Sequence, residues 1–118
     1  MTTSLIPEPT LENACANSDS VAYVASQVIK AGPGMLYRLV GYNSKASAQF
    51  IQLHDAAALP ADTAVPEEVI TVPATSNFAI DFGPYGRKFP TGIVVCNSST
   101  GPTKTLGSAD VWFSAQYK

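Results

Sequence analysis

Charged residues are scarce in this chain. Only 14% of its 118 residues are Asp, Glu, Lys or Arg, whereas soluble domains usually contain roughly 25%. The net charge is −2 at pH 7, and Arg87-Lys88 is the one place where two basic residues are adjacent. Nucleic-acid binding requires several basic side chains on one face, so we expect no nucleic-acid partner. A surface so poor in charge must rely on uncharged polar groups or be covered by another protein.

Long apolar runs are also missing. No segment approaches the ~20 consecutive apolar residues that cross a bilayer, so we expect no membrane partner. The N-terminal stretch MTTSLIPEPT has neither the basic start nor the apolar core of a secretory signal. We therefore expect that it does not act as one.

Residues that bind metals or carry out acid–base chemistry are few. The chain has two cysteines, Cys15 and Cys96, and one histidine, His54, and their spacing matches no zinc motif. Two reduced, half-buried thiols are the simplest interpretation, and a disulfide is the alternative, because spacing does not decide pairing. His54 stands beside Asp55 without a nucleophile in a recognisable motif, so we expect a capping or surface histidine. The sequence predicts no catalytic residue, no metal and no cofactor.

The residues that are present form short apolar segments separated by turn residues. The chain is organised around residues 83–100, which read GPYGRKFPTGIVVCNSST. The apolar run at 93–96 is too short for a helix and predicts a strand that is buried on both faces. Further strands are expected at 21–31, 35–43, 48–54, 67–72, 77–82 and 110–117. A helix competes with a strand at 21–31. Residues 55–66 predict a long surface connection between sheets, in which a helical turn could form.

Two glycine signals constrain how these strands connect. Gly32-Pro33-Gly34 is typical of a tight turn and predicts that the next strand returns antiparallel. Gly41 lies inside a predicted strand, which indicates a bulge or the close approach of another backbone.

The alternation of apolar residues predicts a core. Phe78, Ile80 and Phe82 point inward from the strand at 77–82. We expect the centre of the core where this strand meets 93–96, with Ile80 and Val94 in the middle. Trp112 alternates with the inward-facing residues of the last strand, so its side chain should face outward. The inward face of the last strand carries Val111, Phe113, Ala115 and Tyr117.

About seven short strands with Gly and Pro turns predict an all-β fold. The expected architecture is an antiparallel β-sandwich with Greek-key or jelly-roll-like connections, and a closed barrel is the alternative. Residues 21–118 should form this sandwich domain, and residues 1–20 an extended N-terminal arm. A frayed terminus would have no use for the apolar side chains of Leu5, Ile6 and Leu11, because polar residues would serve equally well there. We therefore predict that the arm docks on a neighbouring subunit, with a frayed end as the alternative.

The candidate interface residues are those whose side chains are apolar, aromatic or basic and not needed for the core. Exposed Trp and Tyr are typical anchors in protein interfaces. A sugar-stacking platform on Trp112 is the alternative use of that residue. The candidates are Leu5, Ile6, Leu11, Tyr85, Arg87 and Trp112.

Several segments together resemble a known group of proteins. Residues 70–74 read ITVPA, 89–95 read FPTGIVV and 98–105 read SSTGPTKT, while 34–55 read GMLYRLVGYNSKASAQFIQLHD. Over 34–117, this pattern resembles small virion structural proteins of tailed bacteriophages. The motif is structural, and it carries no catalytic residues.

This resemblance implies a non-enzymatic β-sandwich protein of the phage particle, of the capsid decoration or cement type. The implied partners are the major capsid protein and further copies of the chain itself, with a trimer favoured because decoration proteins often occupy local threefold axes. The implied location is the exterior of the capsid, after assembly in the host cytoplasm. The alternative is a tail or fibre component, or a carbohydrate-binding module for host attachment.

Overall fold

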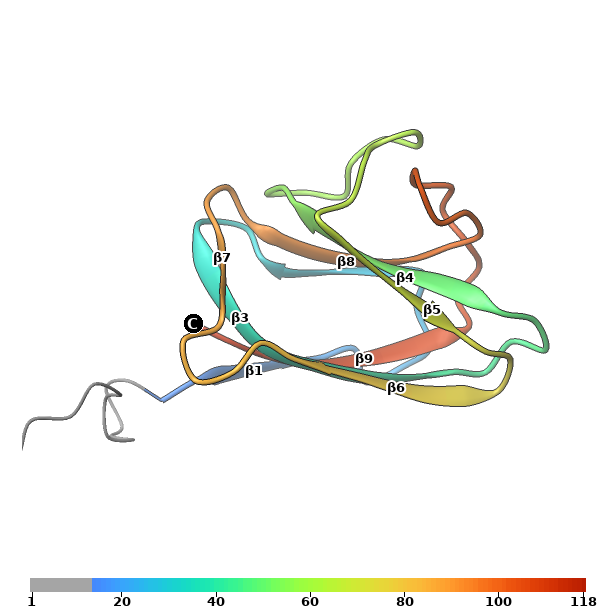
Figure 1. Cartoon of the computed structure of the whole chain (residues 1–118), viewed down its shortest axis with the longest axis horizontal. Coiled ribbons are helices and arrows are strands. Elements are labelled where there is room, and N and C mark those ends of the chain that lie inside the picture. The colour runs from blue at the N-terminus through green and yellow to red at the C-terminus, as the bar shows by residue number, and fades with distance from the viewer. Residues whose placement is uncertain (1–13) are drawn as a thin grey trace, which may run out of the picture.

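The computed structural model describes residues 14–118, which form two antiparallel β-sheets packed face to face (Figure 1). Within these residues there are nine strands and no helix, so none is present that could cross a membrane. The strands are β1 (Ala16–Asp19), β2 (Ser26–Lys30), β3 (Gly34–Asn43), β4 (Gln49–Asp55), β5 (Glu68–Val72), β6 (Ser76–Asp81), β7 (Arg87–Phe89), β8 (Ile93–Ser98) and β9 (Val111–Tyr117).

The strand order identifies the architecture. The first sheet, sheet A, has the order β1-β9-β3-β6, with β7 paired to the start of β3, and the second, sheet B, has the order β2-β8-β4-β5. Apart from β7, this is the order of an eight-stranded double-sheet jelly roll. The predicted β-sandwich is confirmed, and the closed-barrel alternative is wrong.

The core lies between the two sheets. Phe78 of β6 and Phe113 of β9 meet edge to face, with their ring centroids 6.1 Å apart. Ile80, Phe82 and Tyr117 are partly buried and pack against the margin of the core. The buried residues of the core are Ile29, Leu36, Leu39, Ile51, Leu53, Val72, Phe78, Phe89, Ile93, Val95, Val111, Phe113 and Ala115.

Strand β8 is buried on both faces, as its sequence predicted. Ile93 and Val95 belong to the core between the sheets, whereas Val94 is fully buried outside that cluster. Val94 pairs with His54, so both side chains point to the outer face of sheet B. Our expectation that Val94 lies at the centre of the core is therefore wrong, because adjacent residues of a strand face opposite sides. Ile80 lies at the margin rather than at the centre.

Two loops cover the outer face of sheet B. Residues 56–67 connect β4 to β5, and residues 99–110 connect β8 to β9; both lie on the side of sheet B away from sheet A (Figure 1). The loops bind each other through the backbone of Lys104, which donates to Ala64 O at 2.8 Å and accepts from Thr63 N at 2.7 Å. This cover explains how both faces of β8 are buried. A long surface connection was expected at 55–66 and is present, but the expectation that it joins the two sheets is wrong, because β4 and β5 pair with each other in sheet B.

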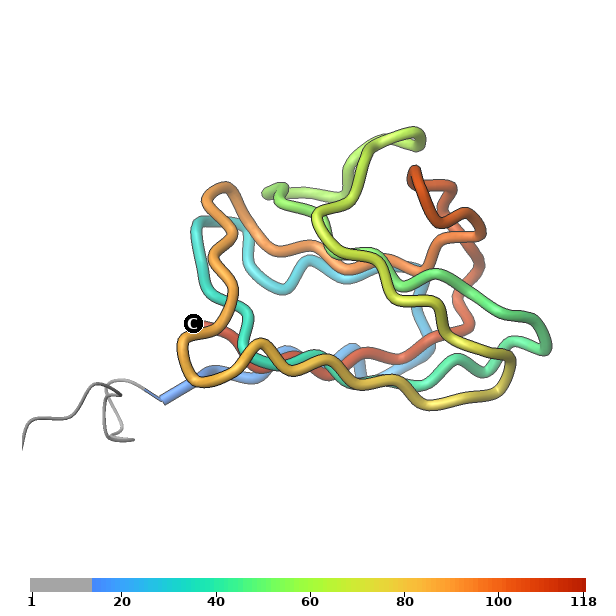
Figure 2. Tube along the Cα trace, in the orientation of Figure 1, coloured from blue at the N-terminus to red at the C-terminus, as the bar shows by residue number. Residues whose placement is uncertain are grey.

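The connection at Gly32-Pro33-Gly34 differs from the prediction. Strand β2 pairs with β8 in sheet B, while β3 pairs with β6, β7 and β9 in sheet A. The chain therefore passes from one layer to the other after β2 (Figure 2) instead of forming a hairpin. The turn signal was correct, but a local signal does not state which sheet the next strand joins.

Two strands were missed, and one was shorter than expected. Strands β1 and β7 have the polar sequences ANSD and RKF, which show no apolar alternation. Pairing starts at Ala16, opposite Tyr117, inside the stretch expected to be an arm. The strand predicted at 21–31 is limited to Ser26–Lys30. The arm residues Leu5, Ile6 and Leu11 lie outside the described residues.

Candidate interaction surface

The outer faces of the two sheets differ. Sheet B is covered by its own loops, whereas the outward-facing residues of sheet A are exposed or half-buried. In sheet A, Tyr42 lies between Trp112 of β9 and Asn77 of β6. In the next row, Val40 lies between Ser114 and Ala79. These two rows therefore combine four apolar or aromatic side chains with the polar Asn77 and Ser114.

At one margin of this face, the chain bulges outward between β1 and β2. Ser20 N donates to Phe113 O at 2.9 Å, and Val24 N donates to Val111 O at 2.8 Å. Between these two anchors, three residues of the segment stand opposite the single residue Trp112. Their side chains cannot all pack on β9, and Val21, Ala22 and Tyr23 are all exposed.

The backbone of this bulge is strained. Val21 has a φ of 64°, which is a left-handed conformation that β-branched residues rarely adopt. Such an outlier costs about 1–3 kcal/mol and persists only where the surroundings impose it. Here Ser20 imposes it, because its Oγ accepts from Phe113 N at 3.0 Å and donates to Ala22 O at 2.8 Å. The Val21 side chain is consequently 95% exposed.

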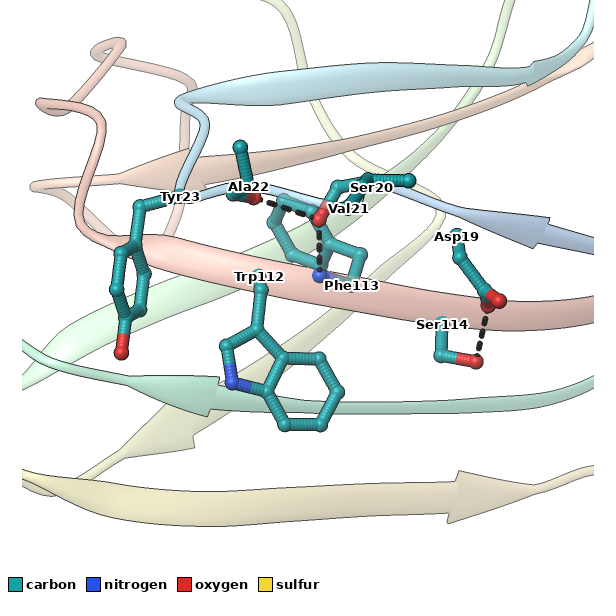
Figure 3. Close-up of a pocket in the computed structure, with 8 residues that line it drawn as sticks. All are labelled: Asp19, Ser20, Val21, Ala22, Tyr23, Trp112, Phe113 and Ser114. Atoms are coloured by element: carbon teal, nitrogen blue, oxygen red, sulfur yellow. Dashed lines mark hydrogen bonds between the residues drawn. The ribbon is translucent and has the colours of Figure 1, made fainter.

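An open pocket of about 570 Å³ lies between the bulge and β9 (Figure 3). The side chains of Tyr23 and Trp112 extend to the same side of β9 there. Some polar groups of the pocket are engaged within the chain: Ser114 Oγ donates to Asp19 Oδ1, and Ser20 is occupied as described above. Its lining residues are Asp19, Ser20, Val21, Ala22, Tyr23, Trp112, Phe113 and Ser114.

Of the candidate interface residues within 14–118, only Trp112 lines this pocket, and Leu5, Ile6 and Leu11 lie outside the described residues. Trp112 faces outward, as its phase predicted, and is 36% exposed. Neither Tyr85 nor Arg87 lines the pocket. Tyr85 is exposed in the turn between β6 and β7, and Arg87 lies in β7. Val21 and Tyr23 were missed because they were assigned to a regular strand. The sequence gives no warning of the bulge, since a valine occupies the left-handed position where a glycine would have signalled a turn.

Arg87 makes its polar contacts within its own chain. Its Nη1 donates to Glu68 Oε2 at 2.7 Å, and its Nη2 donates to Glu67 O at 3.1 Å. The guanidinium also stands 6.0 Å and 5.9 Å from the ring centroids of Phe82 and Phe89. Arg87 thus links β7 of sheet A to the start of β5 in sheet B.

A group of polar residues is buried beneath the loops of sheet B. His54 is 3% exposed, so the expectation of a capping or surface histidine is wrong. Its Nε2 lies 3.1 Å from Gln52 Oε1, and Cys96 Sγ lies 3.8 Å from the same oxygen. Gln52 Nε2 donates to the carbonyls of Thr100, Gly101 and Thr103. Gln52 therefore holds the second loop onto the sheet.

Burial keeps the histidine and the thiol of this group neutral. The pKa of His54 is lowered by burial and, to a smaller extent, by the positive charge of Lys104. Burial raises the pKa of Cys96 to about 11. A thiol that stays protonated is a poor nucleophile, so this pair supports structure rather than catalysis. Cys96 is buried and Cys15 exposed, and both are free thiols, so neither is half-buried as expected.

The two loops share an ion pair. Lys104 Nζ lies 2.6 Å from Asp62 Oδ1, and the lysine side chain is 3% exposed whereas the aspartate is 59% exposed. Leu106 N also donates to Asp62 Oδ1, at 3.2 Å. These hydrogen bonds, that of Lys104 first, lower the pKa of Asp62. From residue 14 onward, no group of three or more His, Cys, Asp or Glu side chains is placed to hold a metal ion.

Comparison with known proteins gives one weak structural likeness. No protein-family model and no curated protein sequence matches the chain. Among solved structures, the coat protein of Tobacco streak virus is similar, with a TM-score of 0.43 and 12% identity, covering 92% of this chain and 90% of that chain. A TM-score this low carries no argument about function, so the jelly-roll assignment rests on the strand order of the molecule itself.

Proposed function

We propose that this chain is a non-enzymatic structural protein of a phage particle, and that it binds the major capsid protein lattice as a decoration or cement protein on the capsid exterior. The observation that carries the proposal is the asymmetry of the sandwich. One outer face is covered by loops of the chain, and the other presents Val40, Tyr42, Ala79 and Trp112 in neighbouring rows.

The physical chemistry of this face suits a protein partner. Exposed apolar patches mark interaction sites, and the exposed Trp112 with the half-buried Tyr42 beside it supplies ring types that frequently anchor binding energy. With a charged fraction of only 14%, the molecule offers little for long-range electrostatic recognition. A rigid sandwich that presents an exposed binding face can bridge neighbouring capsid subunits without catalysing a reaction. Self-association as a trimer on the particle remains part of the proposal.

The test is binding of the purified full chain to expanded phage heads, measured by co-sedimentation. Ala79 and Thr71 form a matched pair, because each is exposed on the outer face of an edge strand, Ala79 on sheet A and Thr71 on sheet B. Ala79→Lys should weaken binding at least about tenfold, which corresponds to ~1.4 kcal/mol. Thr71→Lys should bind like the wild type. Absence of wild-type binding, or equal loss in both variants, would contradict the proposal.

A second candidate function is glycan binding on a tail or fibre, which the neighbouring rings of Tyr23 and Trp112 favour. Sugars are recognised by aromatic stacking together with hydrogen bonds to hydroxyl groups. Ser20 and the Asp19–Ser114 pair are already engaged within the chain, which limits the partners available to sugar hydroxyls. Saturable quenching of Trp112 fluorescence by a glycan, combined with no binding to heads, would establish the second candidate instead.

A further inference from the structure

We propose that the pocket between the bulge and β9 binds the N-terminal segment of a second copy of this chain, with Leu5-Ile6-Pro7 seated against Val21, Tyr23 and Trp112. This contact between copies goes beyond the proposed particle binding, and it can hold or fail independently of it.

The pocket suits an apolar peptide. Three exposed apolar or aromatic side chains line it, with exposed fractions of 95% for Val21, 50% for Tyr23 and 36% for Trp112. Ser20 and the Asp19–Ser114 pair make their hydrogen bonds within the chain, so an occupant contacts mainly the apolar parts of the other side chains. Covering these side chains removes apolar area from water, which is the main favourable term in association. The strained backbone at Val21 holds this residue outward in advance, so little ordering is required of the pocket itself.

The N-terminal segment has matching chemistry and sufficient length. Thirteen residues precede Ala14, and Leu5-Ile6-Pro7 is their main apolar cluster. An extended chain spans about 3.3 Å per residue, so Ile6 can lie up to ~26 Å from Ala14. Pro7 and Pro9 restrict the unbound chain and reduce the entropy that docking costs.

The direction of β1 favours a pocket on another copy. The chain enters β1 at Ala16, opposite Tyr117, while the pocket lies beyond the other end of the strand, after Asp19 opposite Ser114. To reach its own pocket, the segment would have to reverse within residues 12–15. These residues read ENAC, and Asn13 is the only one of them whose residue type is typical of tight turns. A segment that continues without reversal leads away from its own pocket and toward a neighbour.

The chain carries a natural probe for this contact. Trp112 is its only tryptophan, so the intrinsic emission maximum reports whether the pocket is covered. In a dilution series of the full chain, we expect the emission to shift to longer wavelength as sedimentation velocity shows the oligomer dissociating to a monomer. Two double variants test the partners separately: Leu5→Ser with Ile6→Ser in the segment, and Val21→Asp with Tyr23→Asp in the pocket.

Each double variant should weaken self-association at least about tenfold, because both remove the anchors of one contact. The control is Leu59→Asp with Val65→Asp, which adds the same charges at two exposed apolar residues of the loop 56–67. It should associate like the wild type, and all three variants should keep the wild-type unfolding temperature. Mixing the segment variant with the pocket variant should recover association that neither shows alone, because one supplies an intact pocket and the other an intact segment.

Other outcomes would overturn the proposal. A monomer whose Trp112 emission is shielded at every concentration would place the segment in its own pocket. A monomer with solvent-exposed Trp112 at every concentration would show that the segment does not bind there, whether or not the protein decorates particles. Association that survives both double variants would assign the contact to another surface.

Discussion

Replacing Gly41 by alanine tests the packing that supports the exposed face of sheet A. A Cβ atom at Gly41 would lie 2.2 Å from the carbonyl oxygen of Trp112 and 2.4 Å from Cζ of Phe78. The oxygen belongs to the backbone of β9, which pairs with β3 at this position, so it can retreat only if the strands separate. The Phe78 ring is 7% exposed and is packed against Phe113, so it has little space to turn.

The expected cost of Gly41→Ala follows from these contacts. Overpacking a core costs typically 1–3 kcal/mol and occasionally more, and a clash with backbone belongs at the upper end. We expect a loss of about 3 kcal/mol or more in the free energy of unfolding, and a lower melting temperature by roughly 10–20 °C. Urea denaturation, monitored by Trp112 fluorescence and by circular dichroism, measures this loss in the free energy of unfolding.

Gly32→Ala is the matched control for this prediction. A Cβ atom at Gly32 meets nothing within 4 Å, so its variant should stay within about 0.5 kcal/mol of the wild type or gain slightly. If Gly41→Ala is also that mild, β3 and β9 do not pair in this register. In that case Trp112 does not lie beside Tyr42, and the proposed interaction face loses its centre.

Two further predictions concern polar residues. The pKa of His54 is lowered in the fold, so protonation favours the unfolded chain. The contribution of neutral His54 to the free energy of unfolding is complete above about pH 6.5. It is lost as the pH falls toward the lowered pKa. His54→Gln should flatten the dependence of unfolding free energy on pH between about 5 and 6.5, and an unchanged slope would assign it to other groups. Arg87→Lys should lower the free energy of unfolding by about 1 kcal/mol, because an ammonium cannot reproduce the two hydrogen bonds that the guanidinium donates to Glu68 and to the Glu67 carbonyl. A double-mutant cycle with Glu68→Gln measures the coupling energy of the Arg87–Glu68 pair, and a value near zero would refute the prediction.

Several features of the fold could be read from local patterns. Alternation along 77–82 and 110–117 predicted the faces of β6 and β9, because side chains on a strand alternate between core and solvent. The exposure of Trp112 followed from the same rule. The expectation of a close approach at Gly41 was confirmed by the Trp112 carbonyl, because only a residue without a Cβ fits there.

The candidate site could be predicted only in part. Trp112 was expected on the surface, but its neighbours Val21 and Tyr23 were assigned to a strand. Their bulge arises because Ser20 and Val24 bind carbonyls of β9 that are only two residues apart. That mismatch is a property of two segments some ninety residues apart in the chain, and neither segment shows it alone. The burial of His54 was missed for a similar reason, since the loops that cover it come from other parts of the chain.

By itself, the amino-acid sequence determined which segments are strands with an apolar face and that the fold is all-β, because burial imposes a period of two on each strand. Only the tertiary structure decided which strands pair, that Gly32-Pro33-Gly34 joins the two sheets, and that polar segments such as β1 and β7 are strands at all. It also decided that one outer face is covered and the other bare. The physical reason is that pairing and cover depend on hydrogen bonds and packing between distant segments, whose partners leave no local pattern.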